Sequence, residues 1–300
     1  MIYNPAAGGM RRRPRLPERV AEALRRAGHG VTVVPTEGPG SAGCVAKRRI
    51  EAGADLVAVL GGDGTLNEVL PGVAHTEAPL AIIPGGTANV LARELGLGPN
   101  ALKAAARLGE CEPTRIPLGL LRCAPAGEPR YFALMAGVGF DAHIVYRLSL
   151  PLKAKFGELA YWVSSFRQFF RTLDELDVEV NGETFRCTFA LASRVRNYAG
   201  YLHIARRVSL PKPEFELVLF EGTSAPRHYL RYALAVAAGK ASNVKGMYFM
   251  RTAKAAFSAP PAATVYVQVD GEYAGRLPAS IEIVPDAVTL LIPPGYPARN

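Results

Sequence analysis

"VAVLGGDGTLNEVL", residues 57–70, is the stretch that decides the fold. Its apolar run leads directly into "GGDG" (61–64), and a helical pattern follows from Thr65. In open parallel sheets, ligands bind beyond the carboxyl ends of the strands. Glycines let backbone N–H groups point at phosphate oxygens, and the positive end of a helix adds to that attraction. The stretch therefore predicts a buried strand, a phosphate-binding turn and a helix.

Two further glycine-bearing loops are predicted at the same edge of the sheet. "NPAAGG" (4–9) follows the first short strand, and "PGGTAN" (84–89) ends the apolar run "PLAIIP" (79–84). Thr87 is expected to open the next helix as its N-cap, a role that is compatible with a phosphate contact. Because the carboxyl ends of parallel strands meet at one edge, the three loops predict a single ligand-binding edge.

The pattern of the chain changes after residue 118. Before it, apolar runs alternate with helical patterns such as 16–27, which favours a parallel sheet with helices on both faces. After it, strand-like runs such as "RYFALMAGVGF" (130–140) are bounded by turn glycines. The pair Asn181-Gly182 is a strong hairpin signal. This half is expected to be an antiparallel β-sandwich.

At 300 residues the chain is long for one hydrophobic core, so two domains are expected. We predict an α/β nucleotide-binding domain with a parallel, Rossmann-like sheet at 1–118. An antiparallel β-sandwich domain is predicted at 119–300, and its extreme C-terminus is allowed to return to the first domain.

Charge and cysteine content narrow the class of protein. Lys and Arg number 35 against 26 Asp and Glu, a net charge of +9 that favours anionic partners. A nucleic-acid binder would explain the charge but none of the motifs, so no nucleic-acid partner is expected. The four cysteines form no CxxC pair and no apolar run reaches membrane-spanning length, which predicts a soluble, cytoplasmic protein.

Several familiar nucleotide signatures are absent. The sequence contains no GxxxxGK[ST] motif and no protein-kinase set of lysine, HRD and DFG. "GVGFDA" (137–142) formally matches a dinucleotide fingerprint, but no βαβ unit surrounds it. Asp141 would also face a pyrophosphate with like charge. A dinucleotide site is therefore rejected there.

Five motifs together carry a family resemblance: "NPAAGG", "GGDGTLNEV", "PGGTANVLARELGL", "GVGFDA" and "VDGEYAGRLPA". In this order they resemble the diacylglycerol kinase catalytic-domain family, specifically its soluble bacterial lipid kinases, with sphingosine and ceramide kinases as more distant relatives. The resemblance implies a nucleotide-binding domain of the type that NAD kinases and diacylglycerol kinases share, a β-sandwich lipid-substrate domain, and a cleft between them. It also implies ATP, with Mg²⁺ carried on the nucleotide.

The resemblance implies site residues as well. Glu272 of "DGE" is the implied proton acceptor, while Asp63 is implied either as the base or as a group on the magnesium side. Asp141 and Asp270 are implied at the substrate head group. The implied ATP contacts are Asn4, Pro5, Ala6, Ala7, Gly8, Thr36, Gly61, Gly62, Asp63, Gly64, Thr65, Leu66, Asn67 and Thr87.

One position departs from the family pattern. Lys212 stands where the bacterial relatives have an aspartate that helps to hold a structural magnesium. An ammonium group cannot ligate a metal. Either Lys212 supplies the positive charge of the missing ion, or the loop has diverged and the site is gone. Both hypotheses predict that the structural metal site is lost.

The sequence features that could contact a lipid or a membrane are less specific than the glycine motifs. A stripe of apolar residues with basic flanks at 151–171 suits packing over the sandwich better than membrane insertion. Basic clusters such as Arg11–Arg13 add attraction to an anionic leaflet or form a solvated surface. The expected location is cytoplasmic, with peripheral association at the inner membrane surface. Exposed edge strands would allow a homodimer.

The predicted function is ATP-dependent transfer of phosphate to the hydroxyl of a lipid such as diacylglycerol. This makes the chain a phosphotransferase with an alcohol acceptor. One alternative is an NAD kinase, against which Asn67-Glu68 and the block "PGGTANVLARELGL" count. The other is a catalytically silent nucleotide- or lipid-binding protein, against which the presence of Asp63, Thr87 and Glu272 counts.

Overall fold

The computed structural model describes residues 1–124, 127–139, 142, 174–198, 202–205, 207–222, 231–232, 234–235 and 244–296. Asp141 and the apolar stripe predicted at 151–171 lie outside these ranges. The chain divides into two compact units, Met1–Leu118 with Pro285–Asn300, and Gly119–Val284. The roles assigned to the predicted domains, 1–118 and 119–300, stay predictions.

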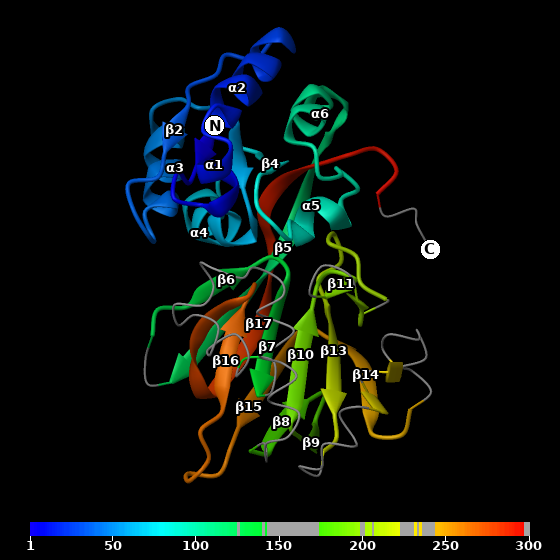
Figure 1. The fold of residues 1–300 in the computed structure, drawn as a ribbon. Coiled ribbons are helices and arrows are strands. Elements are labelled where there is room, and N and C mark those ends of the chain that lie inside the picture. Colours follow the sequence, from blue (N-terminus) through cyan, green and yellow to red (C-terminus); the bar gives the residue numbers. More distant parts are fainter. Residues whose placement is uncertain are drawn as a thin grey trace. The chain divides into compact units, whose positions relative to one another are not determined.

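The first unit is built on a parallel sheet (Figure 1). Its strands lie in the order β2-β1-β3-β4-β17, and all residues of β3 and β4 are buried. Such continuous apolar strands are expected where helices cover both faces of a sheet. The strands are β1 (Ile2–Tyr3), β2 (Val34–Pro35), β3 (Val57–Gly61), β4 (Leu80–Pro84) and the last part of β17 (Glu272–Ile292).

Helices connect these strands and cover the sheet. One core joins Leu60 and Ile83 of the sheet to Leu24 and Ala105, which come from two different helices. Val59, the neighbour of Leu60 in β3, is also buried but lies outside this core, as expected for a strand whose side chains alternate between two covered faces. The helices are α1 (Gly8–Arg12), α2 (Leu16–Arg26), α3 (Ala42–Glu51), α4 (Asp63–Val73), α5 (Val90–Glu94), α6 (Ala101–Ala106) and the 3₁₀ turn η1 (Leu108–Glu110).

The helix after β4 begins later than predicted. Thr87 is exposed and lies in the loop, while α5 begins at Val90 with Asn89 as its N-cap residue. Asn89 adopts a left-handed φ of 47°, and its side chain turns back to pair with both backbone polar groups of Gly86. These two hydrogen bonds form a tight turn that extends the loop beyond Thr87. The prediction that Thr87 caps the helix is therefore wrong.

The second unit is an antiparallel β-sandwich around one core. One layer has the order β14-β13-β10-β7-β16-β17, and β17 also pairs with β15, which leads to β8 and β9. Strand β17 therefore takes part in both layers. The strands are the last part of β5 (Glu112–Ala124), β6 (Arg130–Phe132), β7 (Met135–Gly139), β8 (Leu176–Val180), β9 (Glu183–Cys187), β10 (Phe189–Ser193), β13 (Phe215–Phe220), β14 (Met247–Thr252), β15 (Lys254–Ser258) and β16 (Tyr266–Val269). Strands β11 (Asn197–Tyr198) and β12 (Leu202–His203) form a separate two-stranded sheet.

Two tight turns shape this sandwich. Asn181-Gly182, with φ of 53° and 84°, joins β8 to β9 as the sequence predicts. Asp270-Gly271, with φ of 49° and 82°, joins β16 to β17 in the same way. The single strand expected at 130–140 is instead divided into β6 and β7, because the chain turns at Ala133-Leu134.

Candidate functional site

The predicted nucleotide contacts all lie in the first unit, where β1 to β4 end. Backbone hydrogen bonds connect these ends: the amide of Thr36 donates to the carbonyl of Tyr3 at 2.9 Å, and the amide of Gly85 donates to that of Gly61 at 2.8 Å. The loop at 4–8 leads into α1, and its Asn4 side chain accepts the amide of Ala6 at 2.9 Å. The structure thus brings the three glycine loops to one edge.

The glycines allow these loops to touch one another. A Cβ atom on Gly9 would lie 2.0 Å from the carbonyl oxygen of Gly85, and one on Gly86 would lie 2.5 Å from the Cα of Gly62. Real Cβ contacts do not come so close. The sequence pattern predicts glycines that make room for a phosphate, whereas at Gly9 and Gly86 the contact that excludes a side chain is made by the neighbouring loop.

The turn after β3 leads into a helix whose first backbone amides receive no capping hydrogen bond from the side chain of the N-cap residue. Helix α4 begins at Asp63, with Gly62 as an N-cap residue that has no side chain to satisfy the first amides. The first amides of a helix have no partner within it, and the helix dipole favours anions there. The side chains of Thr65, Leu66 and Asn67 are buried, so these three residues present little beyond backbone to a ligand. The turn fits a nucleotide phosphate chemically.

Asp63 does not point freely into solvent. Its Oδ2 accepts the amide of Val90 at 3.0 Å, and its Oδ1 accepts the amide of Leu91 at 3.2 Å. Burial raises the pKa of the Asp63 carboxyl, and its amide hydrogen bonds and the charge of Arg93 oppose that rise. The predicted catalytic carboxylate therefore already has partners within the protein.

Glu272, the other predicted catalytic carboxylate, is the first residue of β17 in the second unit. Its Oε2 lies 3.3 Å from Nη2 of Arg130, and its side chain is 38% exposed. Arg130 is held in turn by a bond from Nη1 to the carbonyl of Tyr273 at 2.9 Å. The ion pair orients a carboxylate that stays accessible, and the assignment of Glu272 as proton acceptor stays a prediction.

Asp270 precedes Glu272, in the turn between β16 and β17, and is only 9% exposed. Its carboxylate accepts three backbone amides: Ala133 at 3.0 Å, Leu134 at 3.0 Å and Met135 at 2.9 Å. These bonds fix the turn between β6 and β7. The assignment of Asp270 to the substrate head group stays a prediction, as does that of Asp141.

A buried arginine lies at the loop that contains Lys212, where the loss of a structural magnesium site is predicted. Arg194 is 1% exposed, and its guanidinium donates to the carbonyl of Leu210 at 2.5 Å and to that of Lys212 at 3.4 Å. Lys212 itself is exposed. Sequence reasoning considered Lys212 as the replacement cation and missed Arg194, for which the only signal is an arginine at the end of the strand-like run "RCTFALASR" (186–194).

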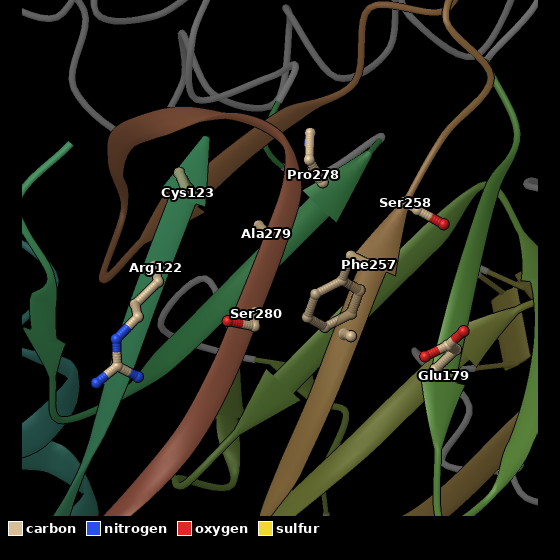
Figure 2. A pocket seen from close by; sticks show the side chains of 9 residues that line it. Arg122, Cys123, Glu179, Phe257, Ser258, Pro278, Ala279 and Ser280 are labelled. Atoms are coloured by element: carbon tan, nitrogen blue, oxygen red, sulfur yellow. The ribbon is translucent and has the colours of Figure 1, made fainter. Parts of the chain in front are cut away.

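The second unit also has an open hollow of about 430 Å³ on its sheet (Figure 2). Side chains from β5, β8, β15 and β17 surround it in the figure. None of the predicted site residues lines it, and burial raises the pKa of its Cys123 thiol to about 11. Its lining residues are Arg122, Cys123, Glu179, Ala256, Phe257, Ser258, Pro278, Ala279 and Ser280.

Comparison with known proteins shows what this chain is similar to. Residues 1–121 match the family model of the diacylglycerol kinase catalytic domain. The diacylglycerol kinase of Staphylococcus haemolyticus is 27% identical over 93% of this chain and 83% of its own length. That of Staphylococcus saprophyticus is 28% identical over 93% and 90%, respectively. The resemblance is confirmed: residues 1–121 match the model of this family, and 93% of the chain is similar to proteins named diacylglycerol kinase.

Solved structures confirm the predicted fold class. A diacylglycerol kinase structure from Bacillus anthracis superposes with a TM-score of 0.74 at 21% identity, covering 98% of this chain and 96% of that one. Yeast NADH kinase, complexed with NADH, gives a TM-score of 0.53 at 13% identity, over 97% and 82%. At these identities the likeness shows the fold alone. Among the helices of the described ranges, none has the length and apolar character to cross a bilayer.

Proposed function

We propose that this chain is a lipid kinase that transfers the terminal phosphate of ATP to the hydroxyl of a lipid alcohol such as diacylglycerol. The observation that carries the proposal is the similarity of 93% of the chain to proteins named diacylglycerol kinase, phosphotransferases with an alcohol acceptor. The glycine loops at the ends of β1, β3 and β4 support it, since phosphoryl transfer depends mainly on positioning and charge stabilisation.

In the proposed reaction, the lipid hydroxyl oxygen bonds to the γ-phosphorus of ATP. The bond from that phosphorus to the bridging oxygen breaks, ADP leaves, and the hydroxyl proton passes to a carboxylate. We assign the proton to Glu272, because its side chain is partly exposed and is oriented by Arg130. The proposed nucleotide contacts are residues 4–8 and 61–67 together with Thr36 and Thr87.

Magnesium is proposed to enter with the nucleotide, where it would neutralise phosphate charge. In the described part of the chain, no three His, Cys, Asp or Glu side chains gather as a metal cage. The Arg194 guanidinium at the carbonyls of Leu210 and Lys212 also makes that loop a poor cation site. The residues present therefore do not fit a separate structural magnesium there.

Two further partners are also proposed, an anionic membrane surface and a second copy of this chain. Attachment to an anionic membrane surface is supported by the exposed, adjacent Arg11, Arg12 and Arg13. A homodimer through the sandwich is supported by Tyr248, one of the exposed large apolar residues, on β14, which is an edge strand among the described residues. Neither partner is needed for the proposed chemistry.

The test is transfer of terminally labelled phosphate from ATP, with magnesium, to lipids in mixed micelles. Diacylglycerol, phosphatidylglycerol, a sphingoid base and a long-chain alcohol are offered, with NAD as a competing acceptor. Glu272→Gln is compared with Glu282→Gln, a matched control because Glu282 lies on the same strand and also pairs with an arginine, Arg122. We expect label in one lipid, strongly reduced in Glu272→Gln and kept in Glu282→Gln.

The other outcomes separate the alternatives. Label found only in NAD would replace the lipid kinase by an NAD kinase. Tight ATP binding without label in any acceptor would leave a nucleotide-binding protein without catalysis. Loss of transfer in both glutamine variants would withdraw the specific assignment of Glu272, because the control removes a carboxylate that the proposal does not use.

A further inference from the structure

Asp63 stands at the beginning of two helices at once. It is the first residue of α4, where a negative charge is favoured by the helix dipole. Its side chain also receives the first two amides of α5, from Val90 at 3.0 Å and from Leu91 at 3.2 Å. One carboxylate therefore connects the turn after β3 with the loop after β4, across 27 residues of sequence.

Helix α5 depends on this carboxylate because its own N-cap residue is engaged elsewhere. Asn89 has a left-handed backbone, and its amide group is bonded to the backbone of Gly86 on both sides at 2.9 Å. It makes no side-chain bond to the first amides of α5. Amides in the first turn of a helix lack partners within the helix and need an external acceptor. Asp63 supplies one oxygen to each of the two.

Among the described residues, the cavity found beside Asp63 is too small for an acceptor alcohol. Its volume is about 10 Å³, and it is lined also by Gly62, Leu66 and Asn89. This volume holds about one water molecule. The neighbouring backbones are already in contact, since a Cβ atom on Gly86 would meet the Cα of Gly62 at 2.5 Å.

We infer that Asp63 is a positioning residue, which holds the loop at 84–89 and α5 in register with the turn at 61–65 and does not take the proton of the acceptor. The claim that Asp63 does not take the proton rests on the proposed function. The claim that Asp63 holds the two loops in register concerns the protein in the absence of any substrate. The two carboxylates predicted as catalytic then have separate tasks, with Asp63 shaping the nucleotide loops and Glu272 handling the proton.

The first measurement is hydrogen exchange of the backbone amides by mass spectrometry and NMR. In the wild-type protein, the amides of Val90 and Leu91 are expected to be protected. In Asp63→Asn, where one oxygen is replaced by a donor, their exchange is expected to rise about tenfold or more, the scale of a lost charge-assisted hydrogen bond. Asp55→Asn, which changes an exposed aspartate before β3, is the control and is expected to leave the exchange unchanged.

Unprotected wild-type amides, or unchanged exchange in a folded Asp63→Asn protein, would overturn the inference. Should Asp63→Asn fail to fold, Asp63→Ser, which keeps one small acceptor at the start of α4, is measured in the same way. These readouts use no substrate. They decide the structural half of the inference even where the wild-type protein phosphorylates no lipid, so the two failures are distinguishable.

Steady-state kinetics test whether Asp63 takes the proton of the acceptor. With the lipid found by the transfer assay, Asp63→Asn is expected to raise KM for ATP about tenfold, as a loosened binding loop would, with a smaller effect on kcat. Glu272→Gln is expected to lower kcat sharply at unchanged KM for ATP and to leave the exchange of α5 unchanged. A sharply lowered kcat in Asp63→Asn at unchanged KM would identify Asp63 as the base and overturn the inference.

Discussion

Gly62 and Gly86 lie back to back, so that a Cβ atom on Gly86 would stand 2.5 Å from the Cα of Gly62. They belong to the turns that follow β3 and β4, neighbouring strands that pair in parallel from Val57–Leu80 to Gly61–Pro84. The register places the two turns side by side, and the missing side chains let their backbones meet. Their packing prepares the edge at which a nucleotide is proposed to bind.

Gly86→Ala tests this packing. The added methyl group meets backbone that cannot move independently, so we expect a loss of about 1–3 kcal/mol in unfolding free energy and weaker binding of ATP. Gly109→Ala is the control, because a Cβ atom there meets nothing within 4 Å. Urea unfolding and nucleotide titration measure both. A Gly86→Ala protein as stable as Gly109→Ala would mean that the two turns are not in contact.

Local pattern predicted the elements of the first unit well. The continuous apolar runs became β3 and β4, and Gly96 follows the end of its helix with a left-handed φ of 71°. Apolar runs and punctuating glycines act within a few residues, so they can be recognised without knowing the fold. The same holds for the Asn181-Gly182 hairpin.

Contacts over long sequence distances could not be predicted in this way. Thr87 is a good N-cap residue by type, but α5 is capped by Asp63 from another loop. Asp270 divides the strand expected at 130–140 by binding amides about 137 residues away. In each case an aspartate of a recognised motif is a structural acceptor, a role that depends on which backbone amides the fold brings near it.

Asp270→Asn tests the structural role of that carboxylate. Asparagine tolerates the left-handed backbone at this turn, so the change acts on the side chain. An NH₂ group would face the amide of Ala133 or of Leu134, and we expect a loss of about 1–3 kcal/mol in unfolding free energy. Asp286→Asn is a matched control, since Asp286 also has a left-handed φ, of 47°, but is exposed. Equal stability of the two variants would argue against the three amide bonds.

Arg194→Met tests whether a guanidinium takes the place of a cation in the loop at 209–214. Methionine fills part of the space but leaves the carbonyls of Leu210 and Lys212 without their donor, so we expect a loss of about 1–3 kcal/mol. Lys212→Met, at an exposed position, is expected to change stability by less than about 0.5 kcal/mol. A chelator is expected to leave the melting temperature of the nucleotide-free wild type unchanged. A lower melting temperature with chelator would show that this protein holds a structural metal.

The buried thiols give a prediction on pH. Burial raises the pKa of Cys187 from its ordinary 9.0 to about 12. Between these values the folded protein keeps the thiol proton that the unfolded chain has lost, so this contribution to stability is complete below pH 9 and is lost as the pH rises toward 12. The unfolding free energy of Cys187→Ala is therefore expected to fall less steeply above pH 9 than that of the wild type.

A thiol reagent checks the same point at pH 8. Because the thiolate is the reactive form, Cys187 is expected to react only after unfolding, while the exposed Cys44 reacts in the native protein. Cys44→Ser identifies the fast phase, since this variant is expected to lose it entirely. Rapid labelling of Cys187 in native protein would contradict both its burial and its raised pKa, and parallel alkaline slopes for wild type and Cys187→Ala would contradict the pKa alone.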